Sequence, residues 1–190
     1  MRAVVVPYRL AWPIEAARLT AELVAVLGPS ARRIEHIGST AIPGMAGKDV
    51  VDLQVGVDDL ADADEQAFGV SLAALGFVRS SHVTDHVPTG RRNPPSGWAK
   101  RLWTRRNGTG VDVNLHVRAV GSPNERFALV FRDWFRAHGE AVAAYGDYKR
   151  QLAGRCPDAE SYAEAKGPVV DVIMVAANEW AEATGWRYPP

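Results

Sequence analysis

Hydrophobic and polar residues alternate strictly in two segments of the chain, residues 51–57 and residues 111–117. Such alternation predicts β-strands that bury one face and leave the other polar. If both strands join one sheet with their apolar sides on the core, their polar side chains share the opposite face. The polar positions are Asp52, Gln54 and Gly56 in the first segment and Asp112, Asn114 and His116 in the second. A solvated outer face of an antiparallel sheet is the ordinary explanation, and a functional site is the alternative.

Apolar residues that recur every three or four positions predict the first helix, residues 13–27. Pro13 suits the first helical turn, and Gly28-Pro29 ends the helix. The apolar residues at three- and four-residue steps are expected to form its buried face. They are Ile14, Ala17, Ala21, Val24 and Leu27.

Further elements follow along the chain. Strands are expected at 32–37, 50–57 and 77–81, and a helix at 60–75. Residues 84–97 contain three prolines and two glycines and form a long loop of the kind that is often functional. Asn107-Gly108 predicts a hairpin turn between strands at 98–106 and 111–117.

The rest of the chain is predicted to be helical. Ser122 and Glu125 form a capping box, in which Glu125 reaches back to the Ser122 amide. Gly139 separates the first helix from the second, Asp158 caps a third, and Pro168 should kink or restart it. We therefore expect an α+β fold in one continuous unit. Its sheet domain covers residues 1–120, and a C-terminal helical extension covers residues 121–190.

The segment "IEHIGSTAIPGMAGKDVVDLQV" (residues 34–55) carries the first chemical signal. A strand that ends at Gly38-Ser39 and opens into a turn presents backbone N–H groups that suit a phosphate. A carboxylate on the next strand, Asp52, could hold Mg²⁺ against that phosphate, and a second carboxylate from a neighbouring strand would complete the site. An ordinary turn is the alternative.

Composition restricts these possibilities. The 190 residues are 47% hydrophobic, as in a globular protein, and 22 Lys and Arg balance 22 Asp and Glu. The net charge therefore argues neither for nor against a polyanionic partner such as nucleic acid, and local clusters must decide the question. Cys156 is the single cysteine, so a disulfide within the chain and a zinc site of several cysteines are excluded. No apolar run approaches the ~20 residues of a membrane span, and we expect a cytoplasmic protein.

The segment "EHIGSTAIPGMAGKDVVDLQV" resembles the signature of the GrpB family, within the polymerase-β-like nucleotidyltransferase superfamily. The resemblance continues through "VNLHV" at 113–117 and "FRDWFRAH" at 131–138. It also includes Tyr8, Trp12, Tyr145 with Lys149, and Tyr162 with Lys166. In some proteins this family's domain follows a dephospho-CoA kinase.

The resemblance implies a nucleotidyltransferase-like mixed sheet with helices on one side and a C-terminal helical extension. It also implies two-metal nucleotidyl transfer, with a Gly-Ser loop on the triphosphate and three acids on the metals. Ile37-Gly38-Ser39 match the loop, and Asp52 matches the first acid. Gln54 stands where the second acid belongs, and an uncharged amide is a poorer ligand. Asp112 is favoured for the third acid, with Asn114 as the alternative.

Other side chains have two interpretations each. His116 could be a general base or a hydrogen-bonded structural histidine. Lys48 could contact a phosphate or be solvated. The pairs Tyr145–Lys149 and Tyr162–Lys166 are each one turn apart, so both lysines could overhang the cleft or lie on the surface.

A basic cluster spans residues 91–106, with Trp98 and Trp103 between its charges. It could bind RNA or protein, reach the phosphates of a ligand, or form a solvated edge. Its basic members are Arg91, Arg92, Lys100, Arg101, Arg105 and Arg106.

The main hypothesis is a protein that binds a nucleotide or another phosphorylated small molecule with Mg²⁺, and transfer of a nucleotidyl group is the first reaction to test. A catalytically inactive module for a nucleotide or CoA-like ligand is the alternative, and an interaction domain is a third. The expected catalytic residues are Asp52, Asp112 and His116, with Asp52 and Asp112 as metal ligands. The expected substrate-binding residues are Gly38, Ser39, Thr40, Lys48, Gln54, Asn114, Arg101, Lys149 and Lys166.

Overall fold

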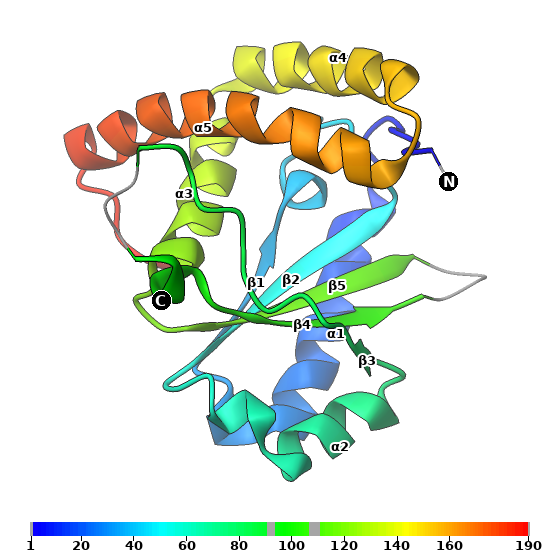
Figure 1. The fold of residues 1–190 in the computed structure, drawn as a ribbon, viewed down its shortest axis with the longest axis vertical. Helices are drawn as coiled ribbons and strands as arrows, with labels where there is room; N and C mark the ends of the chain where they lie inside the picture. Colours follow the sequence, from blue (N-terminus) through cyan, green and yellow to red (C-terminus); the bar gives the residue numbers. More distant parts are fainter. Residues whose placement is uncertain (1, 91–93, 107–110, 190) are drawn as a thin grey trace.

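A mixed five-stranded sheet lies at the centre of the molecule, with helices packed on both of its faces (Figure 1). The structure is a computed structural model and describes residues 2–90, 94–106 and 111–189. The strands are β1 (Arg33–Ile37), β2 (Val50–Val57), β3 (Val78–Arg79), β4 (Arg101–Arg105) and β5 (Asp112–Ala119). The α-helices are α1 (Ala11–Leu27), α2 (Gln66–Ala74), α3 (Pro123–Ala137), α4 (Gly139–Arg155) and α5 (Ala159–Ala183). Short 3₁₀ turns are η1 (Gly28–Ser30), η2 (Ser39–Ala41), η3 (Asp62–Asp64) and η4 (Pro95–Trp98).

The strands lie in the order β1-β2-β5-β4-β3. The β2–β5 pair is parallel, and the other three pairs are antiparallel. Register places Asp52 beside Asn114 and Gln54 beside His116. The α+β fold with a mixed sheet and the shared polar face of β2 and β5 are thus confirmed. The predicted turn at 107–110 and Arg91 and Arg92 lie outside the described residues.

Helices α1 and α2 cover the apolar face of the sheet. Trp12, Leu19 and Leu23 of α1 are fully buried against Val51, Leu53 and Val55 of β2. The predicted inner face of this helix was wrong at four of its five positions, because Ile14 (71% exposed), Val24 (55% exposed), Ala17 and Ala21 lie on the exposed side and only Leu27 is buried. The buried residues are Trp12, Ala16, Leu19, Leu23 and Leu27.

The polar face is covered as well, by the C-terminal helices. Helix α3 crosses it, and Arg132 donates hydrogen bonds to Glu35 Oε2 at 2.6 Å and to the His36 carbonyl at 3.0 Å. Helices α4 and α5 lie together at one end of the sheet, at the top of Figure 1. The polar side chains of β2 and β5 are therefore only partly exposed, with side-chain exposures of 28% at Asp52 and 38% at Asp112, and the ordinary solvated face does not apply.

The helix ends follow the predicted capping with one change. The Ser122 hydroxyl accepts from the Glu125 amide, but the Glu125 carboxylate accepts from the Gly121 amide at 2.7 Å, not from that of Ser122. Asp158 caps α5 by accepting from the Ser161 amide at 2.8 Å. Pro168 lies inside α5 and the helix continues through it, so of the two predicted outcomes, a kink or a restart, the restart is wrong. The predicted boundary at residue 120 falls at the turn between β5 and α3.

Candidate functional site

The loop after β1 turns sharply at Gly38, which has φ +70°. A Cβ atom at this position would lie 2.6 Å from Asp52 Oδ2, far inside van der Waals contact. Glycine therefore allows both the left-handed turn and the close approach of the Asp52 carboxylate to the loop. Gly47 has a similar function on the other side, because a Cβ atom there would lie 2.9 Å from Ser39 Cβ.

Asp52 projects from β2 into this corner. Asn114 Nδ2 donates a hydrogen bond to Asp52 Oδ1 at 2.8 Å, and His116 Nε2 lies 3.6 Å from the same oxygen. Burial alone would raise the pKa of the Asp52 carboxyl, but His116, Asn114 and Lys48 outweigh it and the pKa is lowered. Burial lowers the pKa of His116, and nearby Arg118 and Lys100 lower it further. Asp52 is thus an anion beside a neutral imidazole at pH 7.

Two lysines reach this corner from the C-terminal helices. Lys149 of α4 is only 2% exposed and donates a hydrogen bond to Ser39 Oγ at 2.7 Å. Its Nζ atom also lies 4.8 Å from the centre of the Tyr145 ring. Burial, with Lys166 and Arg150 nearby, lowers the pKa of Lys149 to about 7. Burial and the charge of Lys48 lower the pKa of Lys166, although Asp52 opposes this.

These groups line one cavity of about 110 Å³, which we call the lysine pocket. Its lining residues come from the β1–β2 segment and from α3, α4 and α5. They are Gly38, Ser39, Thr40, Gly47, Lys48, Val50, Asp52, Phe131, Tyr145, Lys149, Tyr162 and Lys166. Three lysine side chains and one carboxylate thus line the pocket. The volume is below the ~300–1,000 Å³ of typical ligand pockets, so it suits one part of a ligand, such as a phosphate group.

Seven of the predicted site residues meet in the lysine pocket. They are Gly38, Ser39, Thr40, Lys48, Asp52, Lys149 and Lys166. Gln54, Asn114 and His116 lie on the same face of the sheet but are not part of its lining. Gln54 is 1% exposed and accepts a hydrogen bond from the Arg118 guanidinium.

Two predicted residues lie elsewhere. Asp112 begins β5 beside Val50, outside the lining, and its carboxylate is 3.8 Å from Arg106 Nε. Arg101 pairs with Val117 and so projects toward the opposite, apolar face of the sheet. There its Nε atom donates to Asp64 Oδ1 at 2.7 Å. Substrate binding by Arg101 in this pocket therefore does not agree with the register of β4.

Comparison with known proteins identifies the family. The family model described as "GrpB protein" matches residues 2–176, which is most of the chain. The chain belongs to the GrpB family.

Relatives and one solved structure agree with this. The UPF0157 protein BH1888 of Halalkalibacterium halodurans is 33% identical over 168 residues, covering 88% of this chain and 78% of that protein. A protein named dephospho-CoA kinase from Mycolicibacterium paratuberculosis is 36% identical over 190 residues, covering 93% of this chain and 46% of that protein. This chain thus spans about half the length of the first curated relatives it matches. The crystal structure of the conserved protein GrpB from Enterococcus faecalis has the same fold, with a TM-score of 0.72 and 22% identity over 93% of this chain and 99% of that one.

The lysine pocket of this GrpB chain does not have the acids of a two-metal site. Within residues 2–90, 94–106 and 111–189, no group of three or more His, Cys, Asp or Glu side chains is placed to hold a metal ion. Asp52 is the only carboxylate among the lining residues. Two Mg²⁺ ions need several oxygen ligands and negative charge, so the residues present do not fit the pair of ions that the sequence resemblance implies.

A buried ionic network, which the sequence did not predict, lies on the polar face of the sheet. Asp85, from the loop before η4, accepts from Lys100 Nζ at 2.7 Å, Arg118 Nε at 2.8 Å and Asn124 Nδ2 at 3.0 Å. Burial would raise the pKa of the Asp85 carboxyl, but Arg118 and Lys100 hold it well below its usual range. No sequence signal marks Asp85, because it lies in an irregular loop and its partners are 15 to 39 residues away.

The basic cluster at 91–106 is dispersed where the structure describes it. Lys100 bonds Asp85, Arg101 bonds Asp64, and Arg105 lies 5.1 Å from the centre of the Phe77 ring. Arg106 Nη2 donates to Asn114 Oδ1 at 2.9 Å. These side chains lie on both faces of the sheet, which gives no single surface for an RNA or protein partner.

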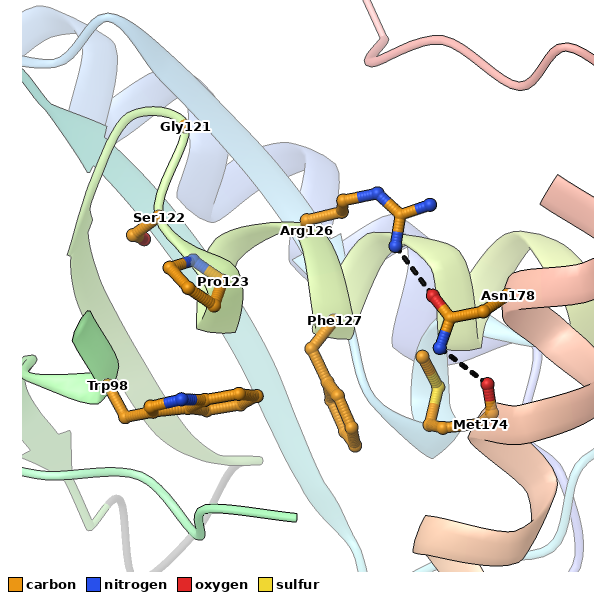
Figure 2. A pocket seen from close by; sticks show the side chains of 8 residues that line it. All are labelled: Trp98, Gly121, Ser122, Pro123, Arg126, Phe127, Met174 and Asn178. Carbon is orange, nitrogen blue, oxygen red and sulfur yellow. Dashed lines mark hydrogen bonds between the residues drawn. The ribbon is translucent and has the colours of Figure 1, made fainter. Parts of the chain in front are cut away.

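A second cavity, of about 250 Å³, lies at the start of α3 (Figure 2). It is lined by Trp98, Gly121, Ser122, Pro123, Arg126, Phe127, Met174 and Asn178. Arg126 Nη1 donates to Asn178 Oδ1 at 2.6 Å, which ties α3 to α5 at the edge of this cavity. It is the larger of these two cavities but contains none of the predicted site residues.

Among the helices that the structure describes, none is long and apolar enough to cross a membrane.

Proposed function

We propose that this chain binds a nucleotide or another phosphorylated metabolite, with the phosphate groups in the lysine pocket. The supporting observation is that Lys48, Lys149 and Lys166 line one pocket, in which Lys149 donates to the hydroxyl of Ser39. Ammonium and hydroxyl groups are donors that phosphate oxygens accept, and hydrogen bonds between charged groups are about twice as strong as neutral ones. Lys149 and Lys166 come from α4 and α5, so the bound ligand would contact both the sheet and the C-terminal helices.

The proposal is binding, without an assigned transfer reaction. Nucleotidyl transfer through two Mg²⁺ ions would need acids that Gln54 and Asn114 do not provide. An ion that arrives with a nucleotide would meet one pocket carboxylate, Asp52. The alternative of a catalytically inactive ligand-binding module therefore agrees better with the lining residues than the transferase does. The kinase name of some longer relatives makes CoA and dephospho-CoA sensible probes.

Thermal melting with a panel of nucleoside triphosphates, CoA, dephospho-CoA and pyrophosphate tests the proposal. A ligand at about 100 times its Kd stabilises a protein of this size by about 2.7 kcal/mol, a rise in Tm of about 5–10 °C. The double variant Lys48→Gln/Lys166→Gln should lose this rise. Arg101→Gln is the matched control, because it removes a cation from the opposite face and should leave the rise intact. No rise with any probe, or an equal rise in the double variant, would show that the proposal is wrong.

A further inference from the structure

The single carboxylate of the lysine pocket already has protein partners on one of its oxygens. Asp52 Oδ1 accepts from Asn114 at 2.8 Å and has His116 Nε2 at 3.6 Å. Asp52 Oδ2 lies against Gly38, 2.6 Å from the position that a Cβ atom would take. Mg²⁺ demands near-octahedral coordination at about 2.0–2.1 Å. A metal ion on Asp52 would have to share this carboxylate with the Asn114 amide.

The remaining charge of the pocket is positive. Lys48, Lys149 and Lys166 line it together with Asp52, so cations outnumber the acid even when Lys149 is neutral. Lys149 is held by Ser39 and by the Tyr145 ring, at 2.7 Å and 4.8 Å respectively. A divalent cation would add to the repulsion among these ammonium groups, whereas an anion relieves it.

We infer that the lysine pocket binds phosphate oxygens directly through its ammonium groups and requires no divalent cation. This inference rests on the proposed function and names its substrate class, a phosphate or diphosphate group that is not complexed with metal. In this role Asp52 is a neighbouring charge beside the lysines and is not a metal ligand.

Calorimetric titration with inorganic pyrophosphate, in EDTA and in excess Mg²⁺, tests the inference. The Kd in EDTA should equal the Kd in Mg²⁺ or be lower, because Mg²⁺ neutralises the anion. Lys48→Gln should raise the Kd in EDTA about tenfold or more, the loss expected for one charged hydrogen bond. Binding that appears only with Mg²⁺ would overturn the inference and leave the proposed function standing. No binding of pyrophosphate, ATP or CoA in either buffer would overturn the proposed function itself.

Asp52→Asn separates the two roles of Asp52 by the direction of its effect. The change is nearly isosteric and removes a negative charge that faces the ligand. Direct anion binding predicts an unchanged or lower Kd for pyrophosphate in EDTA, whereas a metal ligand predicts a loss of binding in Mg²⁺.

If Asp52→Asn does not fold, Asp112→Asn provides a second test, because Asp112 is the other expected metal ligand and lies outside the lining. The Kd of Asp112→Asn for pyrophosphate should match that of the unmodified protein both in EDTA and in Mg²⁺. A loss confined to Mg²⁺ in either variant would overturn the inference.

Discussion

Lys149 Nζ donates a hydrogen bond of 2.7 Å to Ser39 Oγ, across 110 residues of sequence. This contact joins α4 to the turn after β1 and closes the lysine pocket. Two nearby arginines reinforce the same junction. Arg136 Nη2 donates to the Ala41 carbonyl at 2.8 Å, and Arg132 Nη1 donates to the His36 carbonyl at 3.0 Å. The turn is thus held by the C-terminal helices.

Anion binding should weaken as the pH rises through the pKa of Lys149, which burial lowers to about 7. The charged amine attracts phosphate and the neutral amine does so poorly, so the Kd for pyrophosphate should increase by about tenfold between about pH 6 and 9. Lys149→Met is the control, because pyrophosphate itself also titrates. The variant should keep only the probe's own pH dependence. Identical profiles for the two proteins would exclude a contribution from Lys149.

Stability should respond to the same group in the opposite sense. The pKa of Lys149 is about 7 in the folded protein and about 10.5 in the unfolded chain, where the side chain is not buried. The unfolded state therefore binds more protons between these two values. The free energy of unfolding should therefore rise with pH between about 7 and 10.5, relative to Lys149→Met. Urea unfolding of both proteins across this range measures the difference. A difference that does not change with pH would contradict the lowered pKa.

Gly38→Ala should destabilise the fold by more than backbone strain alone, which is about 1–3 kcal/mol at a left-handed position. The added Cβ would also meet Asp52 Oδ2 at 2.6 Å. Gly185→Ala is the matched control, because Gly185 has φ +63° and nothing within 4 Å of its Cβ position. Chemical denaturation should rank Gly38→Ala as the more harmful change. Equal losses would mean that the approach of Asp52 to the loop does not contribute.

Asp85→Asn should cost about 3–5 kcal/mol, because it leaves the charges of Lys100 and Arg118 enclosed without their partner. In the unmodified protein the pKa of the Asp85 carboxyl is lowered from its usual value of 3.8. The stability that Asp85 contributes is therefore present above pH 3.8 and is lost as the pH falls below that value. Asp147→Asn is the control. It breaks the exposed pair with Arg150 and should change stability by less than about 1 kcal/mol. Denaturation at neutral pH distinguishes the two, and similar losses would argue against a special role for the Asp85 network.

Leu19→Ala should cost about 2–5 kcal/mol and Ile14→Ala less than about 0.5 kcal/mol. Leu19 is fully buried against the sheet, whereas Ile14 is 71% exposed. The same denaturation experiment tests which face of α1 is inside. The opposite ranking would show that the helix is rotated from the arrangement described.

The spacing of apolar residues in α1 could not identify by itself which face of the helix is buried. Alanine, leucine and valine at three- and four-residue steps fit two overlapping stripes, one through Ile14 and one through Trp12. A tertiary contact accompanies the second, since Trp12 Nε1 donates to Asp49 Oδ1 at 2.7 Å. The bounds of β2 were predicted correctly, because strict alternation of apolar and polar residues fits a strand and assigns each residue to one face.

The site was predictable to a similar degree. The polar face of β2 and β5 followed from alternation, and Lys149 and Lys166 entered through their one-turn spacing from tyrosines and through the family resemblance. The register of β4 against β5 was beyond prediction, because it depends on the hairpin. That register places Arg101 beside Val117, away from the pocket.

Helix α5 runs without a break from Ala159 to Ala183 and lines both cavities. Lys166 at one cavity and Asn178 at the other are twelve residues apart, about 18 Å along the axis. One continuous helix thus forms part of the wall of both compartments, and Pro168, which donates no backbone hydrogen bond, lies between its two contributions.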